Sequence, residues 1–124
     1  MKALTRKEEE VMKILWKLER AFVKDILELM PDPKPHYNTV SSMVRFMEDK
    51  GYIGHKAYGK THEYFPLISK ESYSKQSLSN LVSGYFSNSY KSVISFMAKE
   101  EEISIEELKE IISMIENESS DHND

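Results

Sequence analysis

The chain has 124 residues and no cysteine, and 17 Lys+Arg against 21 Asp+Glu give it a formal net charge of −4. This length favours one compact domain, or a small domain with an extension, and the absence of cysteine excludes disulfides, thiol catalysis and cysteine-ligated metal sites. A negative overall charge argues, at first sight, against a nucleic-acid binder.

The charge is unevenly distributed along the chain. Residues 1–70 carry 13 Lys+Arg and 10 Asp+Glu, a net charge of +3, whereas residues 71–124 carry 4 and 11, a net charge of −7. The split suggests two regions with different tasks, although a solvated acidic helix surface gives the same split. No apolar run approaches the roughly 20 residues that cross a bilayer, and three glutamates follow the basic N-terminus in place of an apolar signal core. We therefore expect a cytoplasmic protein.

Three helices are predicted in the first 50 residues. Thr5 and Glu8 fit a capping box, in which a hydroxyl and a carboxylate three residues apart satisfy free backbone N–H groups, so a helix should follow. A second helix is predicted over residues 23–30, ended by the prolines of residues 31–35. A third is predicted over residues 38–50, with Asn38 as its cap and a glycine at its end. Its buried stripe is expected at Val40, Met43, Val44 and Met47.

Residues 52–65 predict a β-hairpin, because two aromatic-rich runs flank a Gly-Lys pair that suits a two-residue turn. In the register that this turn sets, Tyr58 pairs with Thr61 and Lys56 faces Glu63. Three helices followed by a hairpin is the order of a winged helix-turn-helix domain, in which the third helix enters the DNA major groove. The predicted fold is therefore mainly α with a small β-hairpin wing, and residues 1–70 form the winged helix-turn-helix domain.

A helical dimerisation region is predicted over residues 71–116. One long helix begins near Ser72, and a last helix begins at Ser104, which forms a second capping box with Glu107. Their apolar stripes need a partner surface, and a symmetric dimer provides the simplest one. The polar residues 117–124 are expected to form a disordered tail. The residues expected in the dimer interface are Leu78, Leu81, Val82, Tyr85, Phe86, Val93, Ile94, Met97, Leu108, Ile111, Ile112 and Ile115.

Residues 54–61 (GHKAYGKT) match the phosphate-binding pattern G-x-x-x-x-G-K-S/T. That chemistry needs a buried strand before the loop and a helix after it, whereas here a strand-like run ending in Pro66 follows. We interpret the match as part of the hairpin and expect no enzyme. His55 and His62 can approach each other across the hairpin, although two solvent-exposed histidines are the simpler interpretation. The histidines lack the i, i+4 helical pairing of a zinc site, so neither a metal nor a cofactor is predicted.

Several segments resemble the penicillinase-repressor family, the BlaI/MecI-type winged-helix repressors of bacteria. The resemblance covers nearly the whole chain, and it depends on the order and spacing of its segments. These are residues 9–16 (EEVMKILW), 38–44 (NTVSSMV), 50–53 (KGYI), 91–96 (KSVISF) and 105–108 (IEEL) with Ile111 and Ile112.

The resemblance implies a homodimeric transcriptional repressor that binds a palindromic operator. In family members studied for β-lactam resistance, a membrane-embedded sensor protease triggers cleavage within the dimerisation helix, and the matching bond here is Ser95–Phe96. Those members have asparagine at the position of Ser95, and the alternative role of Phe96 is a dimer-core aromatic. Copper-responsive relatives bind metal through C-terminal cysteines, which this chain lacks.

The DNA contacts are predicted on the third helix and the hairpin. Thr39, Ser41, Ser42 and Arg45 are expected to face the major groove, where hydroxyls reach base edges or phosphates. Asn38 either caps the helix or touches DNA. The family commonly has Thr-Arg-Leu at residues 45–47, so the arginine has moved by one position, about 100° around the helix. Lys56, Tyr58 and Lys60 are expected to anchor the hairpin to phosphates, and the alternative for the lysines is ordinary solvation.

A second functional class also fits the same domain. Winged-helix domains serve as protein-interaction modules without binding DNA. A gel shift with DNA from upstream of the protein's own gene would separate this alternative from a repressor.

Overall fold

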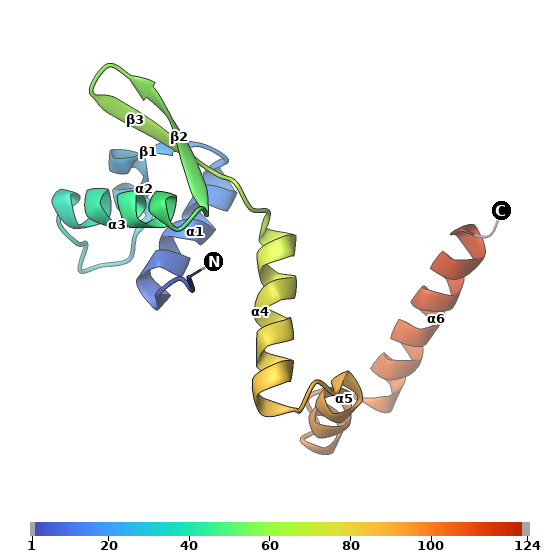
Figure 1. The fold of residues 1–124 in the computed structure, drawn as a ribbon. Helices are drawn as coiled ribbons and strands as arrows, with labels where there is room; N and C mark the ends of the chain where they lie inside the picture. Colours follow the sequence, from blue (N-terminus) through green and yellow to red (C-terminus); the bar gives the residue numbers. More distant parts are fainter. Residues whose placement is uncertain (1, 123–124) are drawn as a thin grey trace. The chain divides into compact units, whose positions relative to one another are not determined.

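The computed structural model describes residues 2–122. The chain divides into two compact units, Met1–Lys75 and Gln76–Asp124. The elements of the first unit are α1 (Arg6–Leu18), β1 (Ala21–Phe22), α2 (Val23–Leu29), α3 (Tyr37–Asp49), β2 (Ile53–Tyr58) and β3 (Thr61–Pro66), as labelled in Figure 1. They are followed by α4 (Lys70–Tyr85), within which the units divide, and by α5 (Tyr90–Lys99) and α6 (Ile105–His122).

The predicted capping box starts α1. The Thr5 hydroxyl accepts a hydrogen bond from the Glu8 backbone N–H at 3.2 Å, and the Glu8 carboxylate accepts one from the Thr5 N–H at 2.8 Å. Two of the N–H groups that a helix start leaves unpaired are thereby satisfied. The helix so placed buries Val11, Met12 and Leu15 completely.

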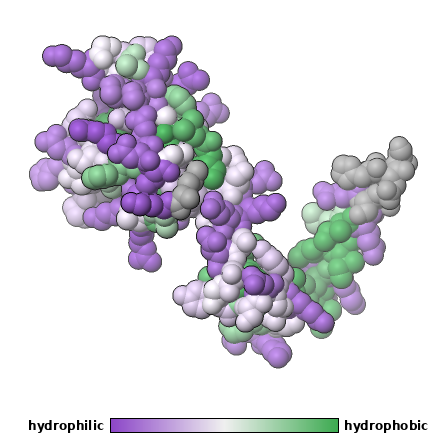
Figure 2. All heavy atoms as spheres, viewed as in Figure 1, coloured by the Kyte–Doolittle hydropathy of each residue, from purple (hydrophilic) through white to green (hydrophobic). Residues whose placement is uncertain are grey.

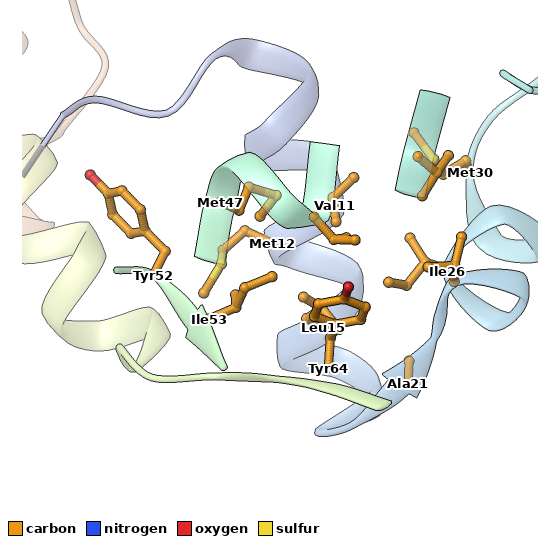
Figure 3. Close-up of a cluster of buried hydrophobic side chains, with 13 residues drawn as sticks. Val11, Met12, Leu15, Ala21, Ile26, Met30, Met47, Tyr52, Ile53 and Tyr64 are labelled. Carbon is orange, nitrogen blue, oxygen red and sulfur yellow. The ribbon is translucent and has the colours of Figure 1, made fainter. Parts of the chain in front are cut away.

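The core of the first unit lies where the three helices meet the sheet. Figure 3 shows Met12 and Leu15 of α1, Met47 of α3 and Ile53 of β2 converging in this cluster. On α3, the predicted stripe is confirmed for Val40, Val44 and Met47, which are fully buried, whereas Met43 is half-buried. The core therefore fixes which face of α3 turns inward, and by exclusion which face remains outside.

The sheet has three antiparallel strands in the order β1-β3-β2. The predicted hairpin register is confirmed, with Tyr58 opposite Thr61 and Lys56 opposite Glu63. Gly59 in the turn has φ +65°, which glycine adopts without strain. The additional strand β1 pairs Ala21 and its neighbour with β3. Two residues are too short to show an alternating pattern, so this strand is not visible in the sequence.

The third helix begins earlier than predicted. Its N-cap is His36, whose carbonyl accepts from the N–H groups of Thr39 and Val40 at 3.0 and 3.2 Å. Asn38 therefore lies inside the first turn, and the prediction that it caps the helix was wrong. The packing of Val40 into the core holds the helix start in place without a side-chain cap. At the other end Gly51, with φ +90°, follows the helix as predicted.

The second unit has a break where one long helix was predicted. The break separates α4 from α5 at Ser87 and Asn88, which have φ values of +51° and +66°. The hydroxyl of Ser89 then accepts from the Ser92 N–H at 3.1 Å and caps α5. A run of short polar side chains supplies both the left-handed residues and the cap. The apolar three- and four-residue spacing continues across the break, which is why it suggested a single helix.

The last helix is longer than predicted. The capping box of Ser104 and Glu107 is present, with both hydrogen bonds at 3.1 Å. Helix α6 runs to His122, so residues 117–122 continue it, where a disordered tail was expected. Extending an existing helix costs little compared with starting one, and glutamate is a good helix former. The final two residues of the expected tail lie outside the described residues.

Figure 2 shows hydrophobic side chains gathered along α6. Ile105, Ile112 and Ile115 are each more than half exposed. In the described part of the chain, no helix combines the length and the apolar character of a membrane span.

Candidate nucleic-acid interface

The outward face of α3 carries three of the eight predicted DNA contacts. The buried stripe of Val40, Val44 and Met47 defines its inner side. At 100° per residue, Asn38, Ser42 and Arg45 fall on the opposite side, and all three are exposed. The face offers an amide, a hydroxyl and a guanidinium, which together donate to and accept from base edges.

Ser41 orients the arginine. Arg45 Nη2 donates to the Ser41 hydroxyl oxygen at 3.3 Å, one turn back along the helix. Ser41 itself is half-buried, and its hydroxyl is engaged with this guanidinium in the unbound protein. Thr39 is exposed but lies on the far flank, where it lines a shallow pocket with Met43 and Pro35. The structure thus brings four of the five α3 residues together and sets Thr39 to one side.

The wing presents its predicted residues to solvent. Lys56, Tyr58 and Lys60 are all exposed. The Lys56 ammonium lies 5.3 Å from the centroid of the Tyr58 ring, which is within the range of a cation–π contact. The same ring packs on Phe22 of β1 at 5.9 Å. Tyr58 therefore supports Lys56 and joins the wing to β1, while Lys60 stands at the hairpin turn.

A groove of about 510 Å³ separates α3 from the wing. Tyr37, Ser41 and Arg45 line it from the helix, and Lys60 and Thr61 from the wing. Two acidic side chains at the end of α3, Glu48 and Asp49, line it as well. The two permanently cationic side chains that line the groove, Arg45 and Lys60, are thus matched by two carboxylates.

A polar contact joins the end of α3 to the wing. His55 Nδ1 lies 2.6 Å from Glu48 Oε2, and the His55 ring stacks on His62 with centroids 4.1 Å apart and planes 8° from parallel. The two histidines do approach across the hairpin, and both line the groove. Burial raises the pKa of the adjacent Tyr64, and the charge of Glu48 adds to the effect, so this phenol remains neutral. Sequence reasoning missed Glu48, because its partner belongs to another element.

A second polar contact supports α3 from behind. Lys50, which caps the helix, lies 2.7 Å from the Glu8 carboxylate and also donates to the Ala3 carbonyl at 3.2 Å. Burial alone raises the pKa of Glu8, but the hydrogen bonds from Lys50 and Thr5 outweigh it and hold this pKa below its ordinary value. The carboxylate is therefore ionised, and its Oε1 atom accepts from both Lys50 and the Thr5 N–H, which ties the end of α3 to the start of α1.

The start of α4 belongs to the first unit. The Trp16 indole N–H donates to the Ile68 carbonyl at 2.9 Å, and the Trp16 ring packs on Tyr73 at 5.6 Å. The Tyr73 hydroxyl donates to the Glu9 carboxylate at 2.6 Å, and its ring meets Tyr52 edge-on at 6.0 Å. The domain boundary expected at residue 70 lies instead after Lys75.

The phosphate-loop match lies in the hairpin. Residues 54–61 comprise most of β2, the turn and the first residue of β3. The chain enters a strand after this segment, whereas phosphate binding by such a loop uses the N-terminus of a helix. The geometry therefore agrees with the interpretation made from the sequence.

The predicted dimer residues differ in exposure. Leu78, Leu81, Ile111, Ile112 and Ile115 are 43–57% exposed. Tyr85 and Ile94 are exposed, Met97 is 38% exposed, and Phe86, Val93 and Leu108 are half-buried. Val82 is only 1% exposed, so it already packs within its own chain.

The Ser95–Phe96 bond lies in the interior of α5. Ser95 is exposed. The Phe96 ring meets Phe86 edge-on, with centroids 5.9 Å apart, which joins α5 to the end of α4. This aromatic therefore already has a packing role within one chain.

Comparisons with known proteins agree with this geometry. The sequence model of the family described as penicillinase repressor matches residues 4–117. The chain is 22% identical over 111 residues to the methicillin resistance regulatory protein MecI of Staphylococcus aureus (strain N315), a match that covers 87% of this chain and 89% of the relative. It is 23% identical over 110 residues to the penicillinase repressor of Bacillus licheniformis, covering 88% and 86%.

A solved structure shares the fold of the first unit. The solution structure of the DNA-binding domain of the repressor BlaI matches with a TM-score of 0.50 and 25% identity, covering 59% of this chain and 94% of that one. The predicted fold class, mainly helical with a winged helix-turn-helix domain, is thereby confirmed.

Proposed function

Because the chain belongs to the penicillinase repressor family, we propose that it is a homodimeric transcriptional repressor that binds a palindromic operator through α3 and the wing. One observation carries the proposal: the face of α3 opposite the core presents Asn38, Ser42 and Arg45 to solvent beside the wing. This is the arrangement that a helix needs in order to read base edges in the major groove.

Each element has a separate task in the proposed complex. The outward side chains of α3 contact base edges, with Arg45 directed by Ser41 and the methyl of Thr39 available on the flank. Lys60 at the hairpin turn and Lys56 above Tyr58 contact phosphates, which fixes the register without reading sequence. The Glu48–His55 contact keeps helix and wing in one geometry as the duplex binds.

Dimerisation is proposed through the second unit. Its helices α4, α5 and α6 leave several large apolar side chains at least 43% exposed, among them Leu78, Ile94 and Ile112. A second copy of the chain covers such a surface with a two-fold axis, and a palindromic operator has the same symmetry. Linking two weakly binding domains makes the second contact intramolecular and raises the affinity without new protein–DNA contacts.

For Phe96 we propose a packing role, supported by its contact with Phe86. Induction by a membrane sensor protease through cleavage of the Ser95–Phe96 bond requires α5 to open first, because the bond lies in the helix interior. Incubation of the intact chain with membranes that contain such a protease, followed by mass spectrometry, tests this route. A cleaved Ser95–Phe96 bond supports it, and an intact chain excludes it. As a repressor the protein acts in the cytoplasm, with the chromosome.

A gel-shift assay with DNA from upstream of the protein's own gene tests the proposal. Binding that survives an excess of random DNA supports a repressor. A shift that disappears when random duplex is added at the same concentration as the upstream DNA contradicts it. The alternative, a protein-interaction module, predicts no specific shift at any salt concentration.

A further inference from the structure

Phe46 is a large apolar side chain on the exposed part of α3. It is 61% exposed. Ser42 lies one turn earlier on the same side of the helix, and Thr39 lies two turns earlier. Both side chains are short, so the Phe46 ring projects beyond them. Buried Met47 and outward Arg45 lie about 100° to either side. Phe46 therefore lies at the edge of the outward face of α3, on the flank that also carries Thr39, and it is not among the residues of the core cluster.

An exposed phenylalanine is not by itself a site, since single apolar side chains on protein surfaces are common. The polar side chains near Phe46 distinguish it from other exposed apolar residues. Asn38, Ser42 and Arg45, on the adjacent outward face, carry hydrogen-bonding groups, whereas a phenyl ring can neither donate nor accept. In the major groove the base edges display donors and acceptors, and the apolar group among them is the C5-methyl of thymine. A ring carried into the groove by α3 has one apolar base group to contact.

We propose that Phe46 contacts a thymine methyl group in each operator half-site and thereby sets the base preference at that position. The inference rests on the proposed function, because it requires α3 to enter the major groove. It adds a second mode of reading to the polar one: Arg45 and Ser42 select hydrogen-bonding patterns, while Phe46 selects a methyl group that lies further along the helix. The ring removes the methyl group from water, and the contact therefore gains binding free energy from the hydrophobic effect.

Uracil in place of thymine tests the contact, because it keeps every hydrogen-bonding group and removes only the methyl. Operator duplexes are first selected from a random pool with the wild-type chain. Each thymine of the selected half-site is then replaced by uracil, one position at a time, and the Kd is measured by fluorescence anisotropy. At one position we expect about a fourfold loss of affinity, the factor for exposing one buried carbon group to water.

The matched variants are Phe46→Ala and Leu67→Ala. Leu67 has the same 61% exposure but lies outside α3, so it controls for loss of an exposed apolar side chain. Phe46→Ala should bind thymine and uracil duplexes equally at the sensitive position, and Leu67→Ala should retain the fourfold difference. Because both side chains are exposed, both variants should keep the wild-type circular dichroism spectrum. Phe46→Leu is a conservative variant that retains an apolar contact, and it should keep part of the difference in affinity between thymine and uracil duplexes.

The outcomes separate the two proposals. If the wild-type chain selects no sequence, the repressor function itself fails. If it selects an operator whose affinity is insensitive to uracil at every thymine, or if Phe46→Ala keeps the same sensitivity, DNA binding stands and the contact of Phe46 with a methyl is overturned.

Discussion

The carboxylate of Glu8 and the ammonium of Lys50 lie 2.7 Å apart, although 42 residues separate them in the chain. Glu8 is in the first turn of α1 and Lys50 caps α3, so each charge also lies at the end of a helix dipole that favours its sign. The pair holds the end of the proposed recognition helix against the N-terminus of α1. Only 5% of the Glu8 side chain is exposed, and removing one partner therefore leaves the other poorly solvated.

Glu8→Gln should destabilise the first unit by about 1–3 kcal/mol at neutral pH, the cost of losing a largely buried charged partner. The effect should depend on pH. Because the folded-state pKa of Glu8 lies below its ordinary value of 4.5, its stabilisation is present above that value and is lost as the pH falls through the lower, folded-state pKa. Urea unfolding should therefore show a difference between wild type and variant at pH 7 that shrinks progressively as the pH is lowered below 4.5.

Glu28→Gln is the control for this prediction, since Glu28 is exposed on α2. Its stability should stay close to that of the wild type at both pH values. A difference between Glu8→Gln and wild type that is as large in acid as at neutral pH contradicts the role of the ionised pair.

Lys60→Ala should reduce the salt dependence of operator binding. Each phosphate contact contributes about 0.9 to the slope of log K against log salt concentration, so the loss of one contact in each protomer should be measurable by titration at several salt concentrations. Lys17→Ala removes an exposed lysine from α1 and should leave the slope unchanged. An unaltered slope and affinity for Lys60→Ala means that Lys60 does not contact the backbone.

Ser42→Ala should change sequence preference more than salt dependence. The hydroxyl lies on the outward face of α3, and a lost base contact costs about 0.5–1.5 kcal/mol at the matching base only. Comparing single-base operator variants measures this, with Ser83→Ala on α4 as the exposed-serine control. Equal weakening on every variant operator points instead to a phosphate contact.

A fragment of residues 1–75 should fold, remain monomeric and bind the operator weakly, about 10²–10⁴-fold below the full chain, because it lacks the linkage between two domains. A shorter fragment ending at Ile68 lacks Tyr73 and its contacts with Trp16 and Glu9, and it should melt at a lower temperature. Sedimentation and calorimetry measure these properties. Full affinity in the monomeric fragment argues against the dimer.

The features that could be predicted from the sequence are those determined by residues close to one another in the chain. The capping boxes of Thr5 and Ser104 were found because a side chain and the N–H that it pairs with are three residues apart. The hairpin register followed from a two-residue turn, which leaves one pairing for Tyr58. The outward α3 residues followed from helical periodicity, which also located the core.

The features that were missed depend on distant residues or weak local signals. Glu48 and His55 meet because a hairpin folds back on a helix, and Trp16 meets Tyr73 over 57 positions of the chain. No local pattern encodes such contacts. The helix break at Ser87 has a local cause, a short run of polar residues. The apolar three- and four-residue spacing continues across this run, so the spacing predicted one unbroken helix.

Trp16 is the one tryptophan of the chain, and within the first unit it contacts both Ile68 and Tyr73, where α1 packs against the start of α4. Its emission spectrum therefore reports on this junction in the unlabelled protein. Tyr73→Ala should shift the emission maximum to longer wavelength as water reaches the indole, and Tyr85→Ala, which truncates an 81% exposed ring, should not. The same intrinsic signal, followed during operator titration, reveals whether DNA binding is felt at the base of the helix that leads toward the proposed dimer surface.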